Sequence, residues 1–288
     1  PSGGLTAAIT DPSSIECVCD PVQIVGTAAG AGFSSYTLEW SQTGNDPWNL
    51  ITTSNSQVVN HTLGVWNAAA LPEGYYHIRL TVQTGGGSSE TAMITVYLNQ
   101  QFDPIDLRSP VTGGVYGGIV CFDGTVWDQC FSRYQVQYSP IPSGGLFDVD
   151  PGQPFYFTPV INDPLAQWDS NTVGDGNYRL FVTGFEECGD SDQATATIEI
   201  DNTLPVAEIR TPEPCTSVCG LVNIVGTATD ANFDHWVLQY AGGGQTSWVT
   251  IASGTEQVEN GVLAEWDTTD LESCCYAIRL LVYDTAVV

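Results

Sequence analysis

The chain of 288 residues is 42% hydrophobic and carries a formal net charge of −27, from 33 acidic residues against 6 basic ones. The apolar content suffices for packed cores, which excludes a wholly disordered protein, and the length predicts two or three domains. The charge excludes nucleic acid and anionic membrane surfaces as partners, because both repel an acidic protein. No apolar run approaches the roughly 18 residues of a spanning helix, so no membrane span is expected.

Nine cysteines indicate an oxidising environment. They include Cys17-x-Cys19, Cys215-x-x-x-Cys219 and the adjacent pair Cys274–Cys275, without the Cys-x-x-Cys spacing of many metal sites. Disulfides explain such clusters better than metal binding, and disulfides persist outside the cytosol. The predicted location is therefore extracellular or at the cell surface.

An internal repeat organises the chain. A shift of 200 positions superimposes its two ends without a gap, so that the run Ile24–Ala28 (IVGTA) meets an identical run at Ile224–Ala228. A diverged middle copy keeps landmarks such as Gly124-Thr125 and Trp168-Asp169. The period is about a hundred residues, which matches one β-sandwich per copy. We predict three domains, at residues 1–99, 100–202 and 203–288.

Taken in chain order, the first copy alternates apolar and polar residues with the period of strands buried on one face. The alternating stretches cover residues 22–24, 36–40 and 76–82, separated by turn-forming segments at 30–32, 44–47, 72–74 and 85–87. A closing strand follows at Glu90–Leu98. The middle copy repeats this order and closes with Ala194–Ile200.

The third copy stops at Tyr283–Val288, before any closing strand. A sandwich without this strand exposes apolar core and unpaired backbone groups. Two interpretations stay open: the strand lies in residues beyond this sequence, or a neighbouring subunit covers the gap through its Pro1–Thr10 segment or another edge. The second, which we favour although Leu5–Thr10 also has the pattern of the first domain's own opening strand, leads to head-to-tail self-assembly of identical subunits.

The recurring pattern, in which Ile-Val-Gly-Thr-Ala precedes Phe-x-x-Tyr/Trp-x-Leu and later Tyr-x-Ile-Arg-Leu-x-Val, resembles bacterial immunoglobulin-like repeats of secreted and surface proteins. The resemblance implies an all-β fold of three tandem immunoglobulin-like antiparallel β-sandwiches. It leaves the role open, since such modules serve as spacers, adhesive arms and polymer subunits.

No catalytic residues are expected, and the chain is interpreted as a non-enzyme. The three histidines, His61, His77 and His235, lack a serine or cysteine partner in any recognisable motif. Arginine recurs at one position of each copy, where it is expected to cross the outer sheet face to a residue on the neighbouring strand: Arg79 to Glu39, Arg179 to Gln137 and Arg279 to Gln239. The best candidates for contacting a glycan are Trp48, Trp127 and Trp248.

The cysteines are assigned by the ends of the sandwiches at which their loops lie. Bridges are expected between the loop of Cys215 and Cys219 and the loop of Cys274 and Cys275. For the remaining loops two pairings stay open: Cys130 and Cys188 bridge each other, or they reach Cys17 and Cys19 in the first domain. Cys121 has no obvious partner and is the candidate for a free or intersubunit thiol.

No cofactor is expected apart from calcium at the junction of the second and third domains. Its candidate ligands are hard oxygen groups on the linker and the flanking loops: Asp201, Asn202, Asp230, Asn232, Asp234, Asp175 and Asn177. The alternative is a set of ordinary acidic turns. Separately, Asn60-His61-Thr62 is an acceptor sequence for N-glycosylation.

Two functions are weighed. The first is an extracellular structural protein, a subunit or segment of a filament, sheath, surface layer or stalk, stabilised by disulfides. The second is an adhesin or a carbohydrate-binding accessory module of a secreted protein. Many cysteines and no catalytic constellation favour the first.

Overall fold

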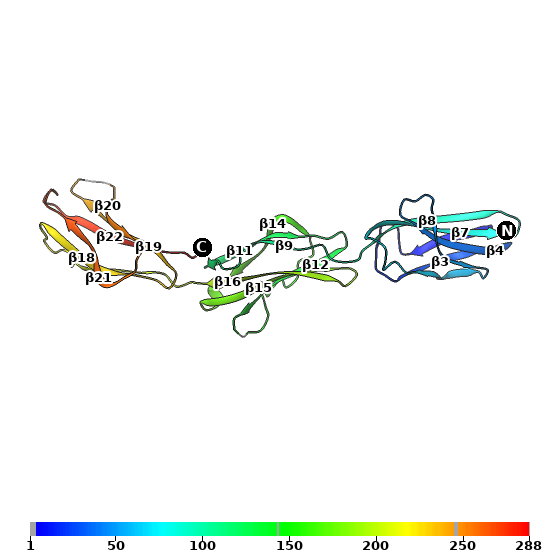
Figure 1. The fold of residues 1–288 in the computed structure, drawn as a ribbon, viewed down its shortest axis with the longest axis horizontal. Coiled ribbons are helices and arrows are strands. Elements are labelled where there is room, and N and C mark those ends of the chain that lie inside the picture. The colour runs from blue at the N-terminus through cyan, green and yellow to red at the C-terminus, as the bar shows by residue number, and fades with distance from the viewer. Residues whose placement is uncertain (1–3, 143, 245–246, 288) are drawn as a thin grey trace.

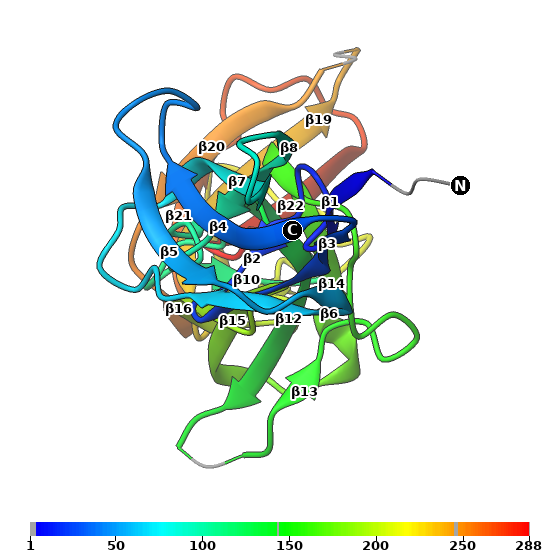
Figure 2. The same ribbon diagram turned by 90° about the vertical axis from the view of Figure 1, so that its right-hand side faces the viewer.

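The computed structural model describes residues 4–142, 144–244 and 247–287. Figure 1 shows three β-sandwiches in a row, with the N-terminus at the outer end of the first and the C-terminus beside the junction of the second and third. Viewed along the long axis, the three sandwiches overlap, and β13 stands away from the stack (Figure 2). The predicted all-β, immunoglobulin-like fold is confirmed.

The first sandwich has two sheets, in the strand orders β1-β3-β6 and β2-β8-β7-β4-β5. Its strands are β1 (Leu5–Asp11), β2 (Cys17–Val18), β3 (Val22–Gly30), β4 (Phe33–Ser41), β5 (Asn49–Ser54), β6 (Val58–Trp66), β7 (Gly74–Thr84) and β8 (Ser89–Leu98). All pairings are antiparallel except that of β2 with β8, which is parallel.

The second sandwich repeats this plan with the sheets β14-β11-β9 and β10-β16-β15-β12-β13. Its elements are β9 (Asp106–Ser109), β10 (Val115–Tyr116), β11 (Ile119–Val126), β12 (Phe131–Pro140), β13 (Phe147–Asp148), β14 (Val160–Asp169), the short 3₁₀ helix η1 (Ser170–Thr172), β15 (Gly176–Glu186) and β16 (Ser191–Ile200). Again only one pairing is parallel, that of β10 with β16.

The third sandwich has two sheets of three strands, β17-β18-β21 and β20-β19-β22. Its strands are β17 (Val206–Thr211), β18 (Leu221–Thr229), β19 (Phe233–Gly242), β20 (Val249–Gly254), β21 (Val258–Asp267) and β22 (Tyr276–Asp284). Among the described residues it has no counterpart of β2 or of β8. One edge of β22 is therefore unpaired.

The cores follow from the alternation read in the sequence. In the first sandwich Ile24, Leu38, Ile78 and Leu80 are fully buried, whereas the polar residues between them face outward. The second sandwich has a core of similar extent, including Phe122, and the third buries far fewer side chains completely. The incomplete sheet of the third sandwich accounts for this difference.

The repeated Gly-Thr pair has a structural cause. A Cβ on Gly26 would collide with the carbonyl oxygen of Ala8 on the neighbouring strand, so only glycine allows this close approach. The following Thr27 accepts a hydrogen bond at its hydroxyl from the backbone N–H of Asn60, at 3.1 Å. Asn60 adopts a positive φ of 47°, a conformation that asparagine tolerates. The second and third sandwiches repeat the contact with Thr125–Asn162 and Thr227–Asn260.

A second recurring contact holds the N-terminal end of β7, β15 and β22, the equivalent strands of the three sandwiches. The Tyr76 hydroxyl donates to the carbonyl of Pro72 at 2.7 Å. Tyr178 donates to Gly174 and Tyr276 donates to Glu272 in the same way, four residues upstream. This is the tyrosine corner typical of immunoglobulin-like sandwiches, and it explains why a tyrosine lies at or near the start of this strand in every copy.

The N-terminal segment forms the opening strand of its own sandwich, as its pattern indicated, and not a connector to another subunit. Leu5–Asp11 forms β1 and pairs with β3 of its own sandwich, from Leu5 opposite Gly30 to Asp11 opposite Val25. Residues 1–3 of the expected Pro1–Thr10 connector lie outside the described residues. The described part is engaged because its apolar residues complete the core of the first sandwich.

Candidate functional site

Two disulfides join the first sandwich to the second. Cys17 bonds to Cys130 and Cys19 bonds to Cys188, with Cα–Cα distances of 5.8 and 5.5 Å. Cys17 and Cys19 lie at and just after β2, and their partners lie in the loops before β12 and before β16. Of the two pairings left open by the sequence, the structure contains the one between domains. The two bridges tie one short segment of the first sandwich to two separate loops of the second.

An unpaired carboxyl group is buried beside the bridges. Glu186 ends β15, two residues before Cys188, and is only 4% exposed. Neither of its carboxylate oxygens has a hydrogen-bond partner. Burial, followed by the negative charges of Asp128, Asp190 and Glu73, raises the pKa of Glu186 to about 7. Burial and the neighbouring negative charges thus disfavour the ionised form of this carboxyl group.

At the second junction the structure brings most of the expected calcium ligands together, in hydrogen bonds to one another. The Asn232 amide donates to the Asp201 carboxylate at 2.9 Å, and the Asp230 carboxylate accepts from the backbone N–H of Asn232 at 2.8 Å. Asp175 accepts from the backbone N–H of Asn202 at 2.8 Å. Hydrogen bonds from the Thr203 hydroxyl and the Asn202 backbone lower the pKa of Asp175.

Two of the expected calcium ligands, Asp234 and Asn177, are not among the residues joined by these hydrogen bonds. Asp234 pairs instead with the neighbouring His235 ring, at 2.8 Å, and Asn177 lies in β15 opposite Glu199. Within the described part of the chain, no three acidic, histidine or cysteine side chains converge in a group able to hold a metal ion. At this junction the polar side chains and backbone groups form hydrogen bonds with one another. Calcium binding there stays a prediction.

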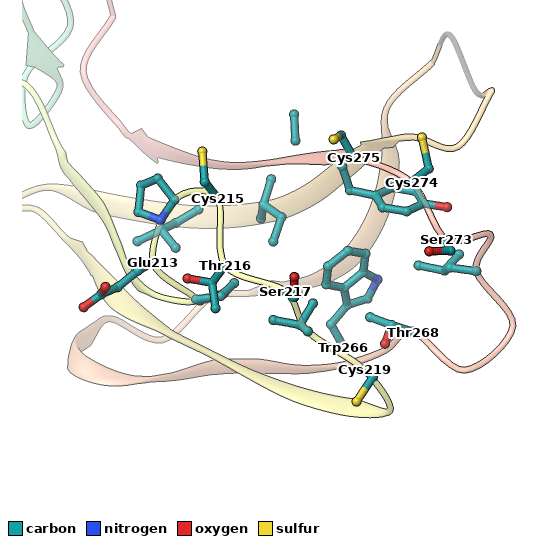
Figure 3. A pocket seen from close by; sticks show the side chains of 18 of the residues that line it. Glu213, Cys215, Thr216, Ser217, Cys219, Trp266, Thr268, Ser273, Cys274 and Cys275 are labelled. Atoms are coloured by element: carbon teal, nitrogen blue, oxygen red, sulfur yellow. The ribbon is translucent and has the colours of Figure 1, made fainter.

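The end of the third sandwich that faces away from the second holds a pocket of about 850 Å³. Its floor is apolar, with Ile209, Trp266 and Ile278, and its rim carries Cys215, Cys219, Cys274 and Cys275. In Figure 3 Cys274 and Cys275 lie on one side of Trp266, and Cys219 lies on the other.

The bridges expected across this pocket are not formed. Cys215, Cys219, Cys274 and Cys275 are free and exposed. The two loops do share one end of the sandwich, as the sequence predicted, but the open pocket separates their thiols. Cys121 is also free and exposed, on β11, where its sulfur lies 3.9 Å from the Gln167 side-chain nitrogen.

The repeated arginines cover tryptophan rings on the outer sheet faces. Arg79 forms an ion pair with Glu39 at 2.8 Å and lies 3.9 Å above the Trp48 ring. Arg279 donates to Gln239 and lies 4.1 Å above the Trp248 ring. These contacts confirm the expected partners of Arg79 and Arg279, while the tryptophan beneath each arginine was not foreseen. They also cover one ring face of Trp48 and of Trp248, two of the glycan candidates.

The third arginine differs. The expected partner of Arg179, Gln137, donates instead to Asp148 at 2.8 Å, because β13 brings that carboxylate alongside β12. The remaining glycan candidate, Trp127, is 38% exposed. Asn60 of the glycosylation sequence is exposed on β6, where its side chain accepts from Thr27.

No catalytic arrangement involves the histidines in the described structure. His77 contacts the Thr95 hydroxyl at 3.0 Å, and His61 accepts from the backbone N–H of Thr62. His235 stacks on Tyr283, with ring centroids 4.4 Å apart. Among the described residues, no helix has the length and apolar character needed to cross a bilayer.

No protein-family model and no curated protein matches this chain. Solved structures with similar folds include domains A168–A170 of titin, at 12% identity, with 98% of this chain and 93% of that chain covered and a TM-score of 0.36. A bacterial ice-binding adhesin aligns at 17% identity over 92% and 86%, with a TM-score of 0.36. Fibronectin(III)-like modules of CbhA from Clostridium thermocellum align at 15% over 68% and 94%, with a TM-score of 0.33. Likenesses this distant carry no argument about function.

Proposed function

We propose that this protein is an extracellular structural arm, a subunit or segment of a filament, sheath, surface layer or stalk. The observation that carries the proposal is the pair of disulfides between the first and second sandwiches. Disulfides persist in oxidising compartments and are rare in the cytosol. Their position supports a mechanical role, because they lock two domains to each other instead of stabilising the core of one.

The surroundings of the bridges support the same role. Glu186 and the linker residue Asn99 are 4% and 3% exposed, so side chains next to the bridges are buried in both the second sandwich and the linker. Each bridge is expected to stabilise the joined state by about 2–4 kcal/mol. The acidic surface keeps such an arm soluble and apart from other anionic polymers.

The test compares the native chain with a Cys19→Ser/Cys188→Ser double variant by small-angle X-ray scattering and non-reducing peptide mapping. Mapping is expected to yield the peptides Cys17–Cys130 and Cys19–Cys188. Loss of one bridge is expected to broaden the distribution of interatomic distances, and Cys121→Ser serves as the matched control that leaves it unchanged. Nine free thiols in the native protein would contradict the proposal. Electron microscopy of native material tests whether the arm assembles with identical subunits.

An adhesin or carbohydrate-binding module is the second candidate. It is supported by Trp127, which is 38% exposed, and by Trp248, which is 39% exposed although Arg279 lies over one face of its ring. Partly exposed aromatic rings next to strand ends, Trp127 directly after β11 and Trp248 directly before β20, suit the apolar face of a sugar ring. A glycan array probed with the native chain and with Trp127→Ala tests this candidate, and binding lost in the variant would favour it over a purely structural arm.

A further inference from the structure

We infer that the junction of the first and second sandwiches holds a binding site for a divalent cation, assigned as Ca²⁺, with Glu186 and Asn99 as its central ligands. The inference rests on the polar groups of this junction and does not depend on the proposed extracellular role. It concerns the disulfide-bonded junction, whereas the calcium ligands predicted from the sequence lie at the second junction.

Two polar side chains beside the bridges are buried without a hydrogen-bond partner. Glu186 is 4% exposed with both carboxylate oxygens unpaired, and Asn99 is 3% exposed with both its side-chain oxygen and nitrogen unpaired. Asn99 directly follows β8, and its backbone N–H donates to the carbonyl of Val18, the residue between the two bridging cysteines of the first sandwich. Glu186 ends β15, two residues before Cys188. Because buried polar groups are almost always paired, two unpaired ones beside the same bridges indicate a ligand.

Glu186 lies among other carboxylates and has no basic group paired with them. The negative charges of Asp128, Asp190 and Glu73 act on Glu186, that of Asp128 most strongly. Asp128 is 3% exposed, and its two oxygens accept hydrogen bonds from two backbone N–H groups, at 2.6 and 3.0 Å. None of the ion pairs among the described residues involves these carboxylates. A bound cation offsets such a concentration of buried negative charge.

The second junction carries side-chain oxygens at the same four positions of the fold. Glu186 lies opposite the phenylalanine that begins β12, as Asp284 lies opposite the one that begins β19. Asp128 and Asp230 each accept a hydrogen bond from the backbone N–H two residues later. The four pairs of equivalent residues are Glu73 and Asp175, Asn99 and Asp201, Asp128 and Asp230, and Glu186 and Asp284. In the second set, the negative charges of Asp201, Asp284 and Asp175 act on Asp230.

These four positions keep their oxygen atoms although the rest of the two junctions differs. Asn232 of the second junction takes the place of Cys130, and Val115 takes the place of Cys17. In a chain with 33 acidic residues among 288, coincidence at four equivalent positions is rare. The repetition is independent of the unpaired atoms, and it points to the same kind of ligand.

The donor set selects the ion. Carboxylate and amide oxygens are ligands for hard cations, and the bridging cysteines offer no thiolate. Ca²⁺ is favoured over Mg²⁺ because it accepts more oxygens in a less regular geometry, which suits side chains supplied by two domains. Glu186 supplies two oxygens, Asn99 one, and Asp128 the lone pairs left by its hydrogen bonds, and water completes the shell. Contact with fewer than three acidic side chains agrees with the lack of a converging acidic triad in the described structure.

The test measures Ca²⁺ binding to the full chain, with its disulfides intact, by isothermal titration calorimetry at pH 8. The titration starts from metal-free buffer, which the pH dependence of Glu186 also requires. Glu186→Gln keeps the side-chain shape and removes the charge, so it is expected to bind one ion fewer per chain than the native protein. The neighbouring Glu187 is exposed, and Glu187→Gln is the matched control that should bind as many ions as the native protein. The difference between variants does not depend on whether the second junction also binds an ion.

A second variant tests the other central ligand. Asn99→Asp gives the first junction the carboxylate that Asp201 gives the second. It is expected to raise the affinity for Ca²⁺ by about tenfold, because ligand charge tunes the strength of calcium sites. In EDTA the same variant should have a lower Tm than the native protein, because it adds a buried negative charge. A purely structural role of Asn99 would give the lower Tm without the gain in affinity.

Two results would overturn the inference. One is an equal number of ions, including none, bound by the native protein and by Glu186→Gln at millimolar Ca²⁺. The other is an affinity in Asn99→Asp that is unchanged or weaker. Disulfide mapping, which tests the proposed function, is unaffected by either result.

Discussion

Replacing Glu186 with glutamine should remove a pH dependence that the first junction imposes on stability. Glu186 is 4% exposed, lacks hydrogen-bond partners for both carboxylate oxygens, and has its pKa raised from 4.5 to about 7 by burial and by Asp128, Asp190 and Glu73. Glutamine keeps the shape of the side chain and is neutral at every pH. The variant thus isolates the free-energy cost of burying the ionised carboxylate in the folded state.

The sign follows from linkage between protonation and folding. Because the folded-state pKa is the higher one, the favourable contribution of the protonated carboxyl is fully present below pH 4.5. It is lost as pH rises through about 7. A shift of this size corresponds to about 3 kcal/mol, since each pKa unit is worth about 1.4 kcal/mol. Glu186→Gln should therefore match the native protein near pH 4.5 and be more stable by about 2–3 kcal/mol at pH 8.

The assay is thermal unfolding at pH 4.5, 6 and 8 with the disulfides intact. For a chain of this size the gain at pH 8 should appear as a rise in Tm of about 4–12 °C. The neighbouring Glu187 is exposed, so Glu187→Gln is the matched control and should change Tm little at any of the three pH values. An unchanged pH slope in Glu186→Gln, or a loss of stability at pH 8, would refute the reasoning.

Three further substitutions test the recurring contacts. Gly26→Ala should destabilise the first sandwich by at least about 2 kcal/mol in urea unfolding, since its Cβ would meet the Ala8 carbonyl. The control Gly85→Ala has open space around the new Cβ and should change the free energy of unfolding by less than about 0.5 kcal/mol. Equal effects of the two substitutions would contradict the steric argument. Tyr178→Phe removes the hydroxyl that donates to Gly174 and should cost about 1 kcal/mol in the same assay, and a neutral effect would show that the corner does not contribute. Arg279→Ala should change stability by less than about 1 kcal/mol while altering Trp248 fluorescence, and an unchanged spectrum would argue against the stacked geometry.

The architecture could be predicted from the sequence because the alternation of apolar and polar residues is a local pattern and recurs in each copy. The alternation around Ile24, Leu38 and Leu80 specifies which strand faces are buried, and the gapless match of the two ends specifies that the same fold occurs twice. The recurring asparagine was missed, because a positive φ at Asn60 leaves no mark on hydrophobic periodicity. Its presence at Asn162 and Asn260 was the available signal.

Pairings between side chains were harder to predict than strands. Loop order shows which cysteines share an end of a sandwich, and that sufficed to place Cys17 and Cys19 near the second domain. It does not give the separation across an end, so the four thiols around Trp266 were expected to bridge although a pocket lies between them. Gln137 illustrates the same limit, because its choice of Asp148 over Arg179 depends on the path of β13.

The Cys19–Cys188 bridge changes how the chain would carry a pulling force. Residues 19 and 188 are 169 positions apart in sequence, and the bridge connects them directly. Tension applied at the two ends would pass through the sulfur atoms and bypass the closed loop, which includes most of the first two sandwiches. At roughly 3.5 Å per extended residue, about 590 Å of polypeptide is withheld from extension until both bridges are reduced, because Cys17–Cys130 still closes 113 positions after Cys19–Cys188 has opened. Reduction of both bridges would thus let a pulling force unfold and extend the first two sandwiches, which the intact bridges shield from that force.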